Sequence, residues 1–275
     1  MTSSTTNFPT QSITGSGSLW DMTHRLWVTT FIGAGGKTTC LQTLTHDMEA
    51  AGLEVVATTT TKVHPELTMD AWRNLYPPPQ KRGAWFWYDG VEDSSGKWRG
   101  PSALSVDKAI AEELRTDSRR YWVIEGDGAR EHRLKCWEYY EPQIPKYSDC
   151  GVLVMDRGLW GKVLEPDAVH RPHKCQDLLG EIWSSESVWR YFLKSPVFDM
   201  QYSMLHWVIL FNSAKTANEN MGEFDPENSF DLLHDLSLKW MEMSENSVKT
   251  DLKPSHLRLA EGDAKKGDLR WFDLW

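Results

Sequence analysis

The residues of this chain best placed to do chemistry lie in one glycine-rich segment near the amino terminus. In order they are Gly33, Ala34, Gly35, Gly36, Lys37, Thr38 and Thr39. Glycines allow a tight turn that presents backbone N–H groups to anionic oxygens, a lysine places a positive charge at the β- and γ-phosphates, and an adjacent hydroxyl can ligate Mg²⁺. The segment therefore predicts a phosphate-binding loop for a purine nucleotide, ATP or GTP, with Mg²⁺. A glycine-rich turn without a ligand is the alternative.

Two acidic residues, Glu125 and Asp127, form the second candidate group. They end an apolar run, 121–124, that predicts a strand. Residues two apart on an extended backbone point to the same face, so both carboxylates can serve one site. Such acids hold the water shell of Mg²⁺ or orient the attacking nucleophile in phosphate-loop enzymes. We therefore predict Lys37, Glu125 and Asp127 as catalytic residues and Thr38 and Glu125 as metal ligands, with a solvated turn as the alternative.

The segments around the loop predict the fold that positions these residues. A strand at 26–32 precedes the loop, apolar residues at helical spacing follow it over 38–51, and a second strand covers 54–62. Strand, helix and strand form a βαβ unit, which implies a right-handed crossover and parallel pairing. The predicted fold class is α/β and resembles a phosphate-loop NTPase, with a mostly parallel sheet flanked by helices. Ligands bind at the carboxyl ends of such strands, where Thr61 and Lys62 would lie.

The rest of the chain supplies further elements by the same criteria. We predict an inserted β-hairpin from Trp85 to Trp98, and strands at 151–155, 206–211 and 256–259. Helices are predicted at 106–114, 181–193 and 230–243, and a loop at 218–228. Residues 1–19 are rich in Ser, Thr and Gly and predict a disordered tail. Residues 20–275 are predicted to form a single α/β nucleotide-binding domain with a variable C-terminal third.

Charge and cysteine content narrow the class of protein. The 275 residues carry a net charge of -9 without a basic cluster, which argues against nucleic acid or an anionic membrane as the main partner. No apolar run is long enough to cross a bilayer. The four cysteines lack zinc-binding spacing and no secretory signal is present, so we predict reduced thiols and a cytoplasmic location. Cys136 and Cys175 lie near the candidate residues, and a reactive role is the alternative to buried, inert thiols.

Several motifs, in order and spacing, resemble the YqeC family, whose members are named as accessory or cofactor-biosynthesis proteins for selenium-dependent molybdenum hydroxylases. The resemblance covers about Trp27 to Pro172. Its motifs are the glycine-rich loop, Thr58–Lys62 with His64-Pro65, Glu125–Arg130, Lys135, Glu141-Pro142, Ile144-Pro145 and His170-Arg171-Pro172. Gly126 and Ala129 stand where the family pattern has alanine and serine.

The resemblance, together with charge, implies a second-substrate site. Its residues are Thr61, Lys62, His64, Arg130, Lys135, His170 and Arg171. The predicted cationic rim, suited to an anionic pterin-type cofactor, consists of Lys62, Arg130, Lys135, His170 and Arg171. A hydroxylase is the other candidate partner. The predicted function is Mg²⁺-dependent nucleotide binding and hydrolysis during maturation of a molybdenum or selenium hydroxylase cofactor. Alternatives are a nucleotide-switched chaperone without significant turnover, a small-molecule kinase, and a Mur-type ATP-dependent ligase, whose loop the glycine-rich segment also resembles.

Overall fold

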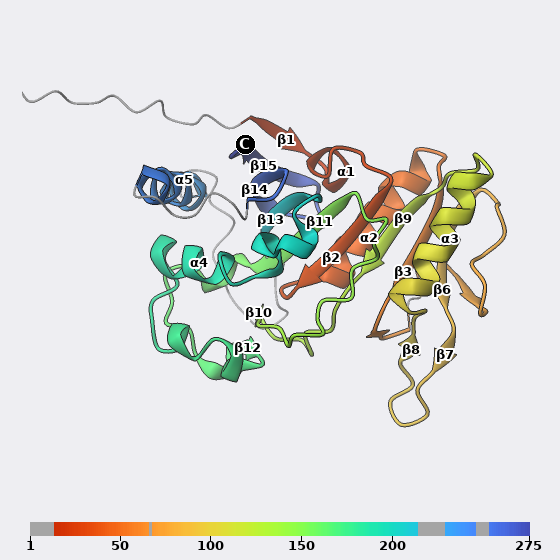
Figure 1. Ribbon diagram of the computed structural model, residues 1–275, viewed down its shortest axis with the longest axis horizontal. Coiled ribbons are helices and arrows are strands. Elements are labelled where there is room, and N and C mark those ends of the chain that lie inside the picture. Colours follow the sequence, from red (N-terminus) through yellow and green to blue (C-terminus); the bar gives the residue numbers. More distant parts are fainter. Residues whose placement is uncertain (1–13, 66–67, 214–228, 246–252) are drawn as a thin grey trace, which may run out of the picture.

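The computed structural model describes residues 14–65, 68–213, 229–245 and 253–275, and one large sheet dominates it (Figure 1). Within these ranges the sheet has ten strands, which are β1 (Gly15–Gly17), β2 (Val28–Gly33), β3 (Glu54–Thr59), β5 (Asp70–Arg73), β6 (Gly83–Tyr88), β9 (Tyr121–Glu125), β11 (Cys150–Asp156), β13 (His206–Asn212), β14 (His256–Asp263) and β15 (Asp268–Asp273). Their spatial order is β1-β15-β14-β13-β11-β2-β9-β3-β6-β5. The strands from β14 to β5 are all parallel, whereas β15 and β1 form an antiparallel edge. The predicted α/β class with a mostly parallel sheet is confirmed.

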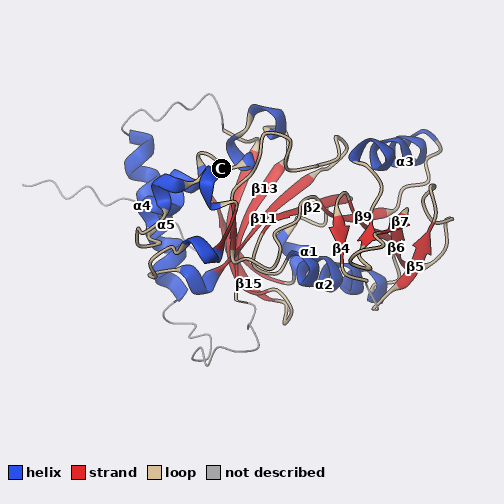
Figure 2. Ribbon diagram, turned by 90° about the horizontal axis from the view of Figure 1, so that it is seen from below, coloured by secondary structure: helices blue, strands red, loops and turns tan. Residues whose placement is uncertain are grey.

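Helices cover both faces of this sheet (Figure 2). They are α1 (Leu19–Met22), α2 (Lys37–Ala50), α3 (Ala103–Arg115), α4 (Ser185–Phe192) and α5 (Ser229–Glu245). Short 3-10 helices lie at Arg157–Leu159, Pro166–Ala168, Pro172–Lys174, Gln176–Leu178, Pro196–Phe198 and Met200–Tyr202. Successive strand residues point to opposite faces. Phe31 accordingly packs with α1 and α2, whereas Ile32 packs on the side of α4 and α5.

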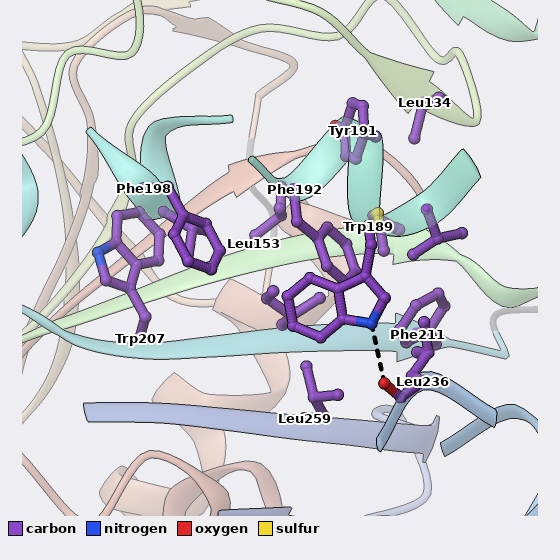
Figure 3. Close-up of a cluster of buried hydrophobic side chains, with 14 of the residues drawn as sticks. Leu134, Leu153, Trp189, Tyr191, Phe192, Phe198, Trp207, Phe211, Leu236 and Leu259 are labelled. Carbon is purple, nitrogen blue, oxygen red and sulfur yellow. Dashed lines mark hydrogen bonds between the residues drawn. The ribbon is translucent and has the colours of Figure 1, made fainter. Parts of the chain in front are cut away.

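The largest apolar cluster lies between the sheet and the pair α4 and α5 (Figure 3). Trp189, Phe192, Trp207 and Phe211 are all completely buried in it. The indole Nε1 of Trp189 donates to the Leu236 carbonyl oxygen at 2.8 Å, so its polar atom is satisfied inside the core. Because buried aromatic rings contribute large apolar areas, this cluster binds the C-terminal third firmly to the parallel strands.

Two smaller sheets lie near the carboxyl ends of the central strands. One is formed by β4 (Lys62–Val63), β8 (Trp98–Arg99) and β7 (Gly90–Val91), and the other by β10 (Leu134–Lys135) and β12 (Val169–His170). The predicted hairpin at Trp85 to Trp98 is therefore only partly right. Trp85–Tyr88 belongs to β6 of the large sheet, and only β7 and β8 form a hairpin. An aromatic run alone does not distinguish a hairpin arm from a buried parallel strand.

Several predicted boundaries also change. The tail prediction for 1–19 is wrong at its end, because β1 pairs with β15 and Leu19 begins α1; residues 1–13 lie outside the described ranges. The helix predicted at 181–193 is only Ser185–Phe192, and the strand predicted at 256–259 extends to Asp263 and precedes β15. The loop predicted at 218–228 lies outside the described residues. In the described ranges, no helix has the length and apolar character needed to span a bilayer.

Candidate functional site

The glycine-rich loop connects the end of β2 to the start of α2, as the sequence predicts. Gly33, Gly35 and Gly36 have φ values of 94°, 85° and 113°, a region that side chains with a Cβ rarely enter. A Cβ on Gly35 would lie 2.4 Å from the backbone nitrogen of Asp156 in β11. The loop is thus packed against β11 so closely that glycine is required for both conformation and space.

The amide groups of this loop are divided between the fold and the cavity beside it. The N–H of Ala34 donates to the carbonyl oxygen of Val154 at 2.9 Å, so it is not available to a phosphate. The expectation that Ala34 contributes its amide to phosphate binding is therefore wrong. The first amides of α2, beginning at Lys37, have no partner within the helix and carry the positive end of its dipole. Amides in this position at a helix amino terminus are able to bind an anion, whereas that of Ala34 is already used by the sheet.

Lys37, Thr38, Glu125 and Asp127 meet at the carboxyl ends of β2 and β9. The ammonium of Lys37 donates to the Gly33 carbonyl oxygen at 2.6 Å and lies 3.3 Å from Asp127 and 3.9 Å from Glu125. The hydroxyl of Thr38 donates to Glu125 Oε2 at 2.8 Å. Both carboxylates therefore lie near the same lysine.

Asp127 differs from Glu125 in what surrounds it. Its side chain is completely buried, and its two oxygens each accept from the Gly33 N–H at 3.1 Å. The indole Nε1 of Trp137 donates to it at 2.8 Å. Glu125 lines the cavity, whereas Asp127 lies beneath the loop and outside the cavity wall. This position suits a residue that holds the loop and Lys37 in place. It does not suit the predicted role of orienting an attacking nucleophile.

Lys135 is also beneath the site and not on its rim. Its side chain is completely buried, and its ammonium donates to the Gly128 carbonyl oxygen at 2.6 Å and to Glu141 at 3.1 Å, and lies 3.5 Å from Asp127. The prediction of a rim residue that meets an anionic substrate is therefore wrong. The sequence around Lys135 did not indicate which carboxylates the fold places near its ammonium. Lys135 instead neutralises the buried Asp127 and the part-buried Glu141.

An open cavity of about 1310 Å³ lies over these residues. It includes six of the predicted loop residues, Glu125, and the second-substrate candidates Thr61, Lys62, His64, Arg130, His170 and Arg171; Gly33, Asp127 and Lys135 are absent from its wall. Seven lysine and arginine side chains and six carboxylates line it. The cavity thus carries no net negative charge although the chain as a whole carries -9.

The far wall of the cavity concentrates positive charge around His170. Partial burial, together with the nearby charges of Lys135 and Arg171, lowers the pKa of His170 to about 4. Arg171 is itself held by Glu138 and Glu141, each at 3.2 Å. Lys62, on the opposite wall, forms an ion pair with Glu92 of the β7–β8 hairpin. Two basic side chains of the predicted rim, Lys62 and Arg171, therefore already have acidic partners.

Sequence reasoning missed residues that support the site from the C-terminal third. Asn212, at the end of β13, donates from Nδ2 to the Gly35 carbonyl oxygen at 2.9 Å and accepts from the Ala264 N–H at 3.2 Å. Tyr191 of α4 donates its hydroxyl to the Lys135 carbonyl oxygen at 2.7 Å. An asparagine that ends an apolar strand was the available signal for Asn212, because strand ends gather at one edge of the sheet. No local signal marked Tyr191.

The cysteines depart from the prediction of four reduced thiols. Cys136 and Cys175 form a disulfide that joins the end of β10 to the segment after β12, whereas Cys40 and Cys150 are free and buried. Burial raises the pKa of the Cys40 thiol to about 12, so it is inert at neutral pH. The 39 residues that separate the paired cysteines concealed their proximity, which the parallel pairing of β10 with β12 creates.

A known protein family covers the part of the chain that contains the candidate site. The sequence model described as YqeC protein matches residues 29–173, which is more than half of the chain and contains the loop, both acids and His170. This chain belongs to the YqeC family. A relative from Escherichia coli (strain K12), named Uncharacterized protein YqeC, is 30% identical over 161 residues. The match covers 56% of this chain and 60% of the relative, so the chain spans about three fifths of that relative's length. No solved structure matches it.

Proposed function

We propose that this YqeC protein binds a purine nucleoside triphosphate with Mg²⁺ at the glycine-rich loop and hydrolyses it. The observation that carries the proposal is the convergence of Lys37, Thr38 and Glu125 at the start of α2, beside an open cavity. A helix amino terminus, a lysine, a hydroxyl and a carboxylate together match what a phosphate and its metal need.

The donor set suits Mg²⁺ in particular. The Thr38 hydroxyl and the Glu125 carboxylate are hard oxygen ligands, lie 2.8 Å apart and both line the cavity. Mg²⁺ prefers such oxygens together with phosphate oxygens and water. When bound, the ion neutralises charge that develops on the phosphoryl oxygens. Glu125 is left to hold a water of the metal shell, while the helix amides fix the phosphates.

Lys37 has to change partners for this function. In the structure its ammonium is paired with Asp127 and the Gly33 carbonyl, next to where phosphates would lie. Contact with a γ-phosphate replaces one anionic partner by another, so the lysine stays neutralised throughout. Asp127 keeps its bonds from Gly33 and Trp137, which preserves the shape of the loop while Lys37 moves.

The size of the cavity supports a second ligand beside the nucleotide. Pockets for single small molecules occupy about 300–1,000 Å³, whereas this cavity has about 1310 Å³. The wall around Arg130, His170 and Arg171 is basic, and an anionic ligand would share these side chains with Glu138 and Glu141. We propose an anionic pterin-type cofactor here and a role for the family member in maturation of a molybdenum or selenium hydroxylase.

Calorimetric titration of ATP and of GTP, each with Mg²⁺, tests the nucleotide site. We expect one nucleotide to bind wild-type protein, and Lys37→Ala and Thr38→Ala each to weaken binding at least about tenfold, because each removes a ligand of the phosphates or metal. Thr43→Ala, which alters the same residue type further along α2, is the matched control. Equal binding by Thr38→Ala and Thr43→Ala would refute the site, as would no binding of either nucleotide.

Release of inorganic phosphate separates hydrolysis from a nucleotide switch. Because Asp127 is buried, Glu125 is the acid of the predicted pair that reaches the cavity. We expect Glu125→Gln to retain nucleotide binding and to lose turnover by about 10²-fold or more. Tight binding with the same slow phosphate release in wild type and Glu125→Gln would instead support the switch.

A further inference from the structure

Three histidines from distant parts of the sequence meet at the amino ends of the strands, whereas the glycine-rich loop lies at the carboxyl ends. His206 is the first residue of β13 and His256 the first residue of β14, and the two are paired in register. His24 follows α1 and reaches the same place from the amino-terminal segment. All three lie outside the range matched by the YqeC family, so the family does not account for the cluster.

The ring nitrogens are arranged as metal ligands are. One nitrogen of each ring lies within 4.8 Å of one nitrogen of both others, and His24 Nε2 is 3.0 Å from His256 Nε2. Nitrogens that bind a tetrahedral zinc ion at about 2.0–2.1 Å lie about 3.4 Å apart. One pair is therefore already near the required separation, and small shifts would bring the third nitrogen within range.

One ring nitrogen of the cluster is left without a hydrogen-bond partner in the described part of the chain. Nδ1 of His206 is buried and, in the described part of the chain, has no hydrogen-bond partner. His24 and His256 bring two imidazole nitrogens together, a contact that needs a proton on one of them. Buried polar atoms in native proteins are normally satisfied, and an unpaired one calls for a missing ion, water or ligand.

The charges around the cluster also suit a bound cation. The nearby Arg258 is neutralised by Asp273, which it contacts at 2.7 and 3.1 Å. Asp273 Oδ1 is also 3.2 Å from His256 Nε2, within reach of the same site.

The backbone at His24 is held in an unusual conformation. His24 and Arg25 have φ values of 56° and 55°, the left-handed region that non-glycine residues seldom occupy. Such conformations persist where the surroundings fix them, often at ligand sites. Here the left-handed turn brings the His24 ring against the starts of β13 and β14.

We propose that His24, His206 and His256 bind a zinc ion, with Asp273 or a water molecule as the fourth ligand. The three nitrogen ligands favour zinc over Mg²⁺, which prefers oxygen. The ion joins the amino-terminal segment to two strands of the C-terminal third. It lies at the amino ends of the strands, remote from Lys37 and Glu125 at the carboxyl ends. Its role is therefore structural and independent of nucleotide binding.

Zinc titration of the full-length chain, stripped with a chelator, tests the site. We expect one zinc per chain and a rise of about 5 °C in the unfolding midpoint when free zinc exceeds the Kd about 100-fold. His24→Gln, His206→Gln and His256→Gln should each weaken binding at least about 100-fold, and Asp273→Asn about tenfold. Co²⁺ in place of zinc should give the visible absorption of a tetrahedral site in wild type only.

Two control variants separate this site from others. His46→Gln removes a partly exposed histidine of α2 and should leave zinc binding unchanged. Glu125→Gln alters the proposed nucleotide site and should also retain zinc, so failure of one proposal does not imply failure of the other. Circular dichroism confirms that each variant is folded before titration. Absence of stoichiometric zinc in wild type, or equal affinity in His206→Gln, His256→Gln and His46→Gln, would overturn the proposal.

Discussion

Replacing Lys135 by methionine tests whether the buried charges beneath the loop stabilise the fold. The side chain is completely buried and its ammonium has three acceptors, the Gly128 carbonyl, Glu141 and Asp127. Methionine preserves much of the side-chain length and removes the charge and all three interactions. We expect a clear loss of stability, because the buried Asp127 and the part-buried Glu141 then lose a cation that neutralised them.

The magnitude follows from the partners that remain. Removal of one member of a buried ion pair costs about 3–5 kcal/mol. Asp127 keeps Lys37 at 3.3 Å and Glu141 keeps Arg171 at 3.2 Å, so neither acid is left without a cation. The expected loss in the free energy of unfolding for Lys135→Met is therefore at the lower end, about 3 kcal/mol.

Urea unfolding followed by tryptophan fluorescence measures this loss. Lys194→Met is the matched control, because Lys194 pairs with Asp177 at 2.6 Å while both side chains are about half exposed. A surface pair contributes about 0.5 kcal/mol or less. If Lys135→Met lowers the free energy of unfolding no more than Lys194→Met does, the buried ion pairs of Lys135 do not stabilise the fold. That result would contradict the supporting role that we assign to Lys135.

Further predictions concern the loop and the wall of the cavity. Gly35→Ala should lower the free energy of unfolding by more than about 2 kcal/mol and abolish nucleotide binding, because the new Cβ clashes with β11 in addition to the cost of a positive φ. The control Gly161→Ala, at φ 75° with open space around it, should lower it by about 1 kcal/mol in the same urea assay. The pKa of His170 is about 4 in the folded chain and 6.5 as an unperturbed group. Between these values the unfolded chain binds the additional proton, so this histidine lowers stability as the pH falls, and His170→Asn should show a shallower pH dependence of the unfolding free energy. An unchanged slope would contradict that pKa.

The sequence alone determined the fold class and the main parts of the nucleotide-site candidate. Apolar runs and glycine positions predicted β2, the loop, α2 and β3, because these features depend on neighbours within a few residues. The acids at the end of β9 were also found, since strand ends in a parallel sheet share one edge. The local sequence was therefore enough to predict that Lys37, Thr38 and Glu125 lie close together.

Only the tertiary structure decided how those residues are divided between support and cavity. Lys135 and Asp127 looked like site residues in the sequence, yet both are buried, because the β10–β12 pair and α4 close over them. The strand identity of Trp85–Tyr88 likewise depended on pairing with β3 and β5. Burial and pairing are set by which distant segments pack together, and periodicity along the chain does not encode them directly.

The disulfide and the histidine cluster make the same point over longer distances. Cys136 and Cys175 are 39 residues apart, and His24 contacts a histidine 232 residues away. Their spacing in the sequence matches no metal or disulfide pattern, because the ligands come from separate elements that the sheet order brings side by side. The sequence thus determined which chemistry each segment offers, and the parallel sheet decided which of these segments meet.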